Sequence, residues 1–107
     1  MTTFDKREEG FEAKFAHDEE LHFRALARRN KLLAAWASGL MGQVGSEAEA
    51  YAGSLLAPEY LGKSDDRLVL KLSADLKSKG IERPPEEILG KMKDLLARAI
   101  TDIKDGH

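Results

Sequence analysis

An apolar stripe with an eleven-residue repeat runs through the first third of the chain. Its members follow one another at spacings of 7, 4, 7, 4, 7, 4 and 3 residues: Phe4, Phe11, Phe15, His22, Leu26, Leu33, Ala37 and Leu40. Because an eleven-residue repeat closely matches the period of a nearly straight α-helix, these positions share one narrow face. The stripe widens only after residue 20, where a second row joins it: Leu21, Ala25, Leu32 and Trp36.

The change in width predicts two roles for the two halves of the stripe. A wide stripe suits burial in a protein's own core, whereas a narrow aromatic stripe suits a helix that binds in the groove of a partner. The first half has polar or small flanks, and Gly10 interrupts it. A short helix without a docking surface is marginal in water, so we expect this half to be poorly ordered alone. The alternative is that its three phenylalanines fold back over the protein as ordinary core.

Length and composition predict one soluble domain. The chain has 107 residues, of which 42% are apolar and 34% charged, and it contains no cysteine. This length suits a single modest core, and the lack of cysteine excludes disulfide and thiolate chemistry. No apolar run approaches the roughly 20 residues that span a bilayer. The N-terminus does not resemble a secretory signal. We therefore expect a cytoplasmic protein without direct membrane insertion.

Charge is distributed unevenly over the first third of the chain. The net charge of −2 argues against a general nucleic-acid binder. Residues 5–20 carry seven acids and three bases, and Arg24, Arg28, Arg29 and Lys31 then follow within eight residues. Acids early and bases late in a helix complement its dipole, so a solvated helix face explains most of this pattern. A second interpretation makes the four cations a patch that binds phosphate, as in a nucleotide, or an acidic partner.

Helix is the only regular structure that the sequence predicts, since strand signals are nearly missing. The first helix is expected to end within residues 39–45, where three glycines supply left-handed caps. A capping box between Ser46 and Glu49 is expected to start the second helix. This helix ends before Pro58, because proline disfavours helical geometry at the preceding residue.

Two further helices are predicted in the second half of the chain. The third opens near Asp65 or the preceding serine and stops near Gly80, and the fourth runs from about Pro85 to Lys104. Their expected inward residues recur at helical spacing: Leu68, Val69, Leu72 and Leu76 in the third, and Ile88, Met92, Leu95, Ala99 and Ile103 in the fourth. Helices with short connections indicate a bundle. We predict an all-α fold, a small four-helix bundle at residues 20–107 with a mobile N-terminal extension at residues 1–19.

No arrangement of residues indicates a catalytic centre. His17 and His22 are five residues apart, so on a helix they point to different faces and cannot chelate one metal ion as an i, i+4 pair can. No serine, histidine and acid form a recognisable triad. The glycines at 39–45 lack the lysine and hydroxyl residue of a P-loop, because Ser46 and Glu47 follow them. We therefore expect neither catalysis nor a bound cofactor or metal.

The first helix carries a resemblance to a known family. The runs concerned are MTTFD at 1–5, GFEAKF at 10–15, KFAHDEEL at 14–21, ARRNKLL at 27–33 and Trp36-Ala37. They resemble the zeta subunit of alphaproteobacterial F-type ATP synthases, an ATPase inhibitor family. The likeness is specific over residues 1–37 and continues more loosely through residues 51–52 and 84–104. Residues 58–64 depart from the acidic connector, containing proline and glycine, that is expected there.

The resemblance implies a bundle that carries a mobile inhibitory segment. This segment enters a catalytic interface between the alpha and beta subunits of the rotary head, near the gamma subunit, and blocks ATP hydrolysis. Such a protein is peripheral to the inner membrane through the ATP synthase. In this chain the segment corresponds to residues 1–19. Its implied contacts are the apolar anchors Phe4, Phe11 and Phe15 and the polar rim residues Asp5, Arg7, Glu8 and Lys14. The other hypothesis is a small helical scaffold or a weak nucleotide-binding module that uses the basic patch.

Overall fold

The computed structural model describes residues 19–62 and 64–105, and most of these residues are helical. The α-helices are α2 (Glu19–Leu40), α3 (Ser46–Ser54), α4 (Asp66–Ser78) and α5 (Pro85–Lys104), and a short 3-10 helix, η1, spans Pro58–Tyr60. Within those two ranges there is no strand, so the predicted all-α four-helix fold is confirmed. The predicted mobile extension at residues 1–19 lies outside the described residues except for Glu19, which is the first residue of α2.

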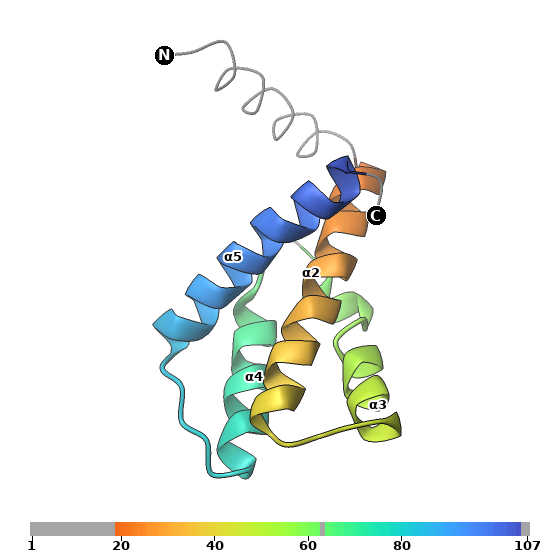
Figure 1. Ribbon diagram of the computed structural model, residues 1–107. Coiled ribbons are helices and arrows are strands. Elements are labelled where there is room, and N and C mark those ends of the chain that lie inside the picture. Colours follow the sequence, from red (N-terminus) through yellow and green to blue (C-terminus); the bar gives the residue numbers. More distant parts are fainter. Residues whose placement is uncertain (1–18, 63, 106–107) are drawn as a thin grey trace.

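Helix α2 is the central element of the bundle. It packs against α3, α4 and α5, while α4 also packs against α5 and η1. Figure 1 shows α2 and α5 crossing near one end of the molecule, with the first turns of α2 beside the last turns of α5. No helix of the described part is long and apolar enough to cross a membrane.

The core of the bundle is built from the inward faces of α2, α4 and α5 and the turn after α3, and Tyr51 and Ala52 of α3 pack against it while half-buried. Its buried members are Leu33, Ala34, Ala37, Leu55, Leu68, Leu72, Leu76, Ile88, Met92 and Leu95. Ala25, Leu26 and Ala99 are also buried. The inward residues predicted for α4 and α5 are confirmed, except that Val69 and Ile103 are half-buried. Burial of each leucine or isoleucine contributes about 1.5–3 kcal/mol, so this one cluster is the main source of stability.

The apolar stripe on α2 is buried at Leu26, Leu33 and Ala37 and half-buried at Leu40. Its remaining member on this helix, His22, is exposed. Trp36, from the second row that widens the stripe, is half-buried and packs against the core cluster. Its ring lies 5.9 Å from Lys91 Nζ of α5, in a cation–π arrangement. The indole is large, and its ring packs on the core while one face remains open to a solvated cation.

Glycine ends both α2 and α4 in the same way. Gly42 and Gly80 have φ of 72° and 75°, the left-handed conformation that side chains disfavour. The amide of the next residue then bonds back to the last helical turn: Gln43 N to Ser38 O and Ile81 N to Leu76 O, both at 2.9 Å. This is the Schellman arrangement, and the predicted glycine caps are confirmed.

The predicted capping box at the start of α3 is wrong. Ser46 is already the first helical residue, and Gly45 occupies the N-cap position without any side-chain hydrogen bond. The amide of Glu49 instead donates to the carbonyl oxygen of Gly45, at 3.1 Å. Because the helix begins one residue earlier than a serine cap requires, the Ser46 hydroxyl lies inside the first turn and cannot cap it.

Candidate interaction surfaces on the first helix

The residues expected to bind a partner fall into two groups in the structure. The anchor and rim residues of the N-terminal segment lie outside the described residues: Phe4, Asp5, Arg7, Glu8, Phe11, Lys14 and Phe15. The four cations of the predicted basic patch all lie on α2 and are described. The structure places these four cations in different surroundings.

Arg29 lies inside the protein and is only 2% exposed. Its Nη1 contacts both carboxylate oxygens of Asp65, at 3.1 and 3.2 Å, and its Nε donates to Asn30 Oδ1 at 2.9 Å. Asp65 is the N-cap residue of α4 but makes no side-chain capping bond. Its carboxylate instead pairs with Arg29, and this ion pair holds the start of α4 against α2.

Asn30 is the second buried polar residue of α2, with no exposed surface. Its amide Nδ2 donates to the carbonyl oxygens of Leu55 and Tyr60, at 2.8 and 2.9 Å. Leaving a buried carbonyl oxygen without a hydrogen-bond donor costs free energy, and the connector between α3 and α4 has no regular backbone hydrogen-bond pattern to supply one. Asn30 therefore holds this connector against α2. The buried residues Arg29 and Asn30 and the partly exposed Asp65 form one polar network between α2, the connector and α4.

Replacing Asn30 with alanine is expected to lower the free energy of unfolding by about 2–3 kcal/mol, because two buried carbonyls lose their donor. A urea titration followed by circular dichroism measures this change. Thr101→Ala is the matched control, since its hydroxyl bonds to Ala97 O on an exposed part of α5. The control should change stability by less than about 0.5 kcal/mol. Equal effects of the two substitutions would contradict the role of Asn30.

Arg28 pairs with the last turns of α5. Its Nε and Nη2 donate to one oxygen of Asp102, at 3.0 and 2.8 Å. The pair joins the early turns of α2 to the end of α5, where both helices meet in Figure 1. Arg28 is paired with Asp102, and among the described residues no ion pair is found for the two exposed cations of the predicted patch, Arg24 and Lys31. Anion binding by the patch stays a prediction.

A groove that includes Arg28 in its lining lies between α2 and α5. It has a volume of about 320 Å³ and is lined by Phe23, Arg24, Ala27, Arg28, Lys31 and Ile103. We call it the basic groove. Phe23 is 54% exposed at its edge, which is unusual for a large aromatic side chain. Its described lining combines cationic and apolar side chains.

A second polar cluster joins α3 to α4. Tyr51 Oη donates to Asp75 Oδ2 at 2.8 Å, and Lys71 Nζ lies 3.0 Å from the same oxygen and 5.4 Å from the centre of the Tyr51 ring. Burial, together with the hydrogen bond to the Asp75 carboxylate, raises the pKa of the Tyr51 hydroxyl above its ordinary value of 10. The cluster therefore stabilises the packing of α3 against α4.

Tyr51→Phe is expected to destabilise the protein by about 1 kcal/mol at neutral pH. A raised pKa in the folded state gives stability that is complete below the pKa of the unfolded chain and is lost as pH rises above it. The difference in unfolding free energy between the two proteins should therefore stay constant below pH 10 and shrink above it. Urea titrations between pH 7 and pH 11 measure it. A difference that grows above pH 10 would contradict the assignment.

The fold and these surfaces define a class: a small helical-bundle protein whose described side chains are arranged for stability and for binding. A family model named ATPase inhibitor subunit zeta matches residues 1–102, and the chain belongs to this family. The match spans the N-terminal segment as well as the bundle, so the resemblance is confirmed beyond the residues that carried it most strongly. No curated protein matches the chain.

Sequence reasoning missed the interior position of Arg29 and Asn30. The charge pattern suggested that Arg29 belonged to a solvated face with the neighbouring cations. The signal was nevertheless present, because Leu26, Arg29, Asn30 and Leu33 follow the i, i+3, i+4, i+7 spacing of one buried helix face. A polar pair on such a face indicates a buried hydrogen-bond network.

Proposed function

We propose that this protein stops ATP hydrolysis by inserting residues 1–19, as a helix, into a catalytic interface of an F-type ATP synthase. The interface lies between an alpha and a beta subunit, close to the gamma subunit. Family membership supplies the inhibitory role and the association with ATP synthase. The proposal adds the segment, its mode of binding and the three subunits that it contacts.

The observation that carries the proposal is the change in width of the apolar stripe. In the described part, Leu33 and Ala37 of the wide half lie in the core cluster, and Leu32, Trp36 and Leu40 pack against it. The narrow half, with Phe4, Phe11 and Phe15, precedes the described part of α2. A narrow aromatic stripe suits a helix that binds in the groove of a partner, and this pattern supports the ATP synthase as the binding site of the narrow half.

The physical requirements of the site match such a segment. Aromatic anchors in desolvated pockets dominate the free energy of binding at many protein interfaces. The charged neighbours Asp5, Arg7, Glu8 and Lys14 are suited to a polar rim, where they set orientation more than affinity. A segment that folds on binding sacrifices some affinity per unit area but reaches into a narrow cleft that a folded bundle cannot enter.

Cross-linking to the catalytic head tests this proposal. A photoreactive residue placed at position 11 should cross-link to the alpha or beta subunit, and the purified protein should inhibit ATP hydrolysis by the same preparation. A photoreactive residue at Leu89, which is exposed on α5, is the matched control. Inhibition accompanied by cross-links from position 89 alone would show that the bundle is the inhibitor and would overturn the proposal.

A further inference from the structure

The basic groove brings together features that the bundle does not need for its own stability. Phe23 is exposed at its edge and is the one aromatic among the large apolar side chains that the described part leaves exposed. The others, Val44, Leu70 and Leu89, do not line this groove. An exposed aromatic ring beside a groove offers apolar surface on which a side chain of a partner can pack.

The positive charge of the groove favours a partner that carries carboxylates. Arg24 and Lys31 are exposed on α2, and within the described residues neither has an ion-pair partner. Arg28, which lies between them along α2, pairs with Asp102. The groove therefore offers two cations without an ion-pair partner among the described residues, one on each side of a paired arginine. An apolar group flanked by carboxylates complements this arrangement.

The position of the groove indicates which protein supplies those carboxylates. Along α2, which rises 1.5 Å per residue, Phe23 lies about 6 Å and Lys31 about 18 Å beyond Glu19. If residues 1–19 occupy a cleft, the groove then begins one turn outside its mouth. The Arg28–Asp102 pair ties this part of α2 to α5, so the groove is carried to the mouth as a preformed surface.

We infer that the basic groove is a second docking surface, which receives an acidic, apolar-bearing segment of the protein whose cleft the N-terminal segment enters. Carboxylates lie opposite Arg24 and Lys31, and an apolar side chain packs on Phe23. This inference rests on the proposed function. Two linked contacts bind more tightly than either alone, since the second forms at a high effective concentration. The groove also sets the orientation of the bundle beside the head.

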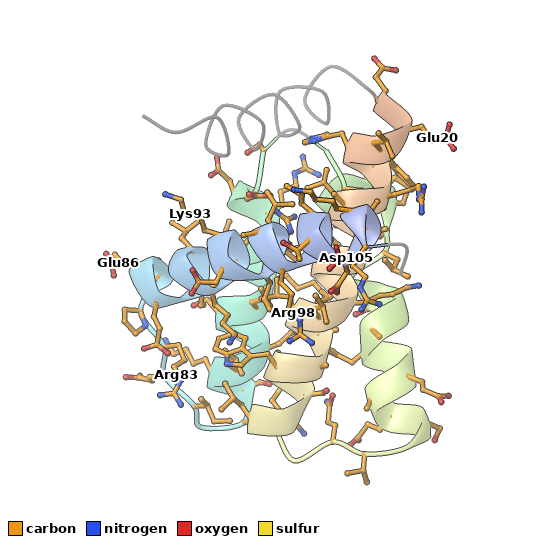
Figure 2. The ribbon with its side chains drawn as sticks, turned by 45° about the horizontal axis from the view of Figure 1, so that its top comes forward. Glu20, Arg83, Glu86, Lys93, Arg98 and Asp105 are labelled. Atoms are coloured by element: carbon orange, nitrogen blue, oxygen red, sulfur yellow. The ribbon has the colours of Figure 1, made fainter. Side chains whose placement is uncertain are left out.

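Charge reversal in the full-length protein tests this surface. The double variant Arg24→Glu, Lys31→Glu should bind the catalytic head at least about tenfold more weakly, and its loss of affinity should shrink as salt is raised, because screening weakens exposed charge contacts. The double variant Lys93→Glu, Arg98→Glu is the matched control. It makes the same change in net charge at exposed positions of α5 that do not line the groove (Figure 2).

Phe23→Ala tests the same surface by a substitution that leaves the net charge unchanged. Phe23 is half exposed, so the variant should keep its fold in a thermal melt and still bind the head several-fold more weakly. Equal affinities for the groove variant and the α5 control would overturn the inference. So would tighter binding or stronger inhibition by Arg24→Glu, Lys31→Glu, because that result would mean that the groove holds the protein's own acidic N-terminal segment. A dimer that dissociates on charge reversal, without a change in affinity for the head, would assign the groove to a second copy of this chain.

These outcomes separate the inference from the proposed function. Substitution of Phe11 and Phe15 tests the inserted segment, and charge reversal at Arg24 and Lys31 tests the groove. If the groove variant matches its control while the phenylalanine variant fails to inhibit, the inference fails and the proposed function stands. If the phenylalanine variant inhibits fully, the proposed function itself fails.

Discussion

Leu33→Ala is expected to lower the free energy of unfolding by about 2–5 kcal/mol. Leu33 has no exposed surface and lies on α2, the helix that contacts each of the other three. Truncation removes buried methyl groups and leaves a cavity that the surrounding helices fill only in part. For a domain of about this size the melting temperature should fall by roughly 10 °C or more.

Leu70→Ala is the matched control for this change. It removes the same atoms from α4, but its side chain is 70% exposed, so stability should change by less than about 0.5 kcal/mol. Thermal melts and urea titrations of the two variants provide the comparison. Similar losses at both positions would contradict the described core, because they would mean that Leu33 is no more buried than Leu70.

Helix boundaries were well predicted where local chemistry determines them. The bounds of α5, Pro85–Lys104, agree with the prediction because proline is favoured at a first helical position and the apolar period continues to the end. The end of α4 agrees because Gly80 takes the left-handed conformation of a cap. These signals act within one or two turns, so they are readable from the chain alone.

Features that depend on contacts between distant segments were not predicted. The ion pair of Arg29 with Asp65 joins residues 36 apart, and that of Arg28 with Asp102 joins residues 74 apart. A charge pattern on one helix cannot reveal such partners. The basic groove has the same origin, since its wall at Ile103 comes from the far end of the chain. The sequence therefore predicted a basic patch on the correct helix, α2, but not the groove that this helix forms with α5.

The second large effect is expected in the N-terminal segment. Phe11→Ala together with Phe15→Ala should weaken inhibition of ATP hydrolysis severely, because each buried aromatic anchor contributes about 2 kcal/mol or more to an interface of this kind. The same double variant should melt within about 2 °C of the unaltered protein, since the proposed function assigns these two side chains to the partner interface and not to the core. Leu70→Ala with Leu89→Ala is the matched control, because it removes two exposed apolar side chains from the bundle.

Titration of ATP hydrolysis with the folded Phe11→Ala, Phe15→Ala protein tests the central claim most directly. The assay uses ATP synthase from the same organism, with the unaltered protein and the Leu70→Ala, Leu89→Ala control in parallel. The account predicts full inhibition by the unaltered protein and the control, and a shift of at least about tenfold in the half-inhibiting concentration of the phenylalanine variant. Undiminished inhibition by a folded phenylalanine variant would contradict the account, and loss of its fold would show that these side chains belong to the core.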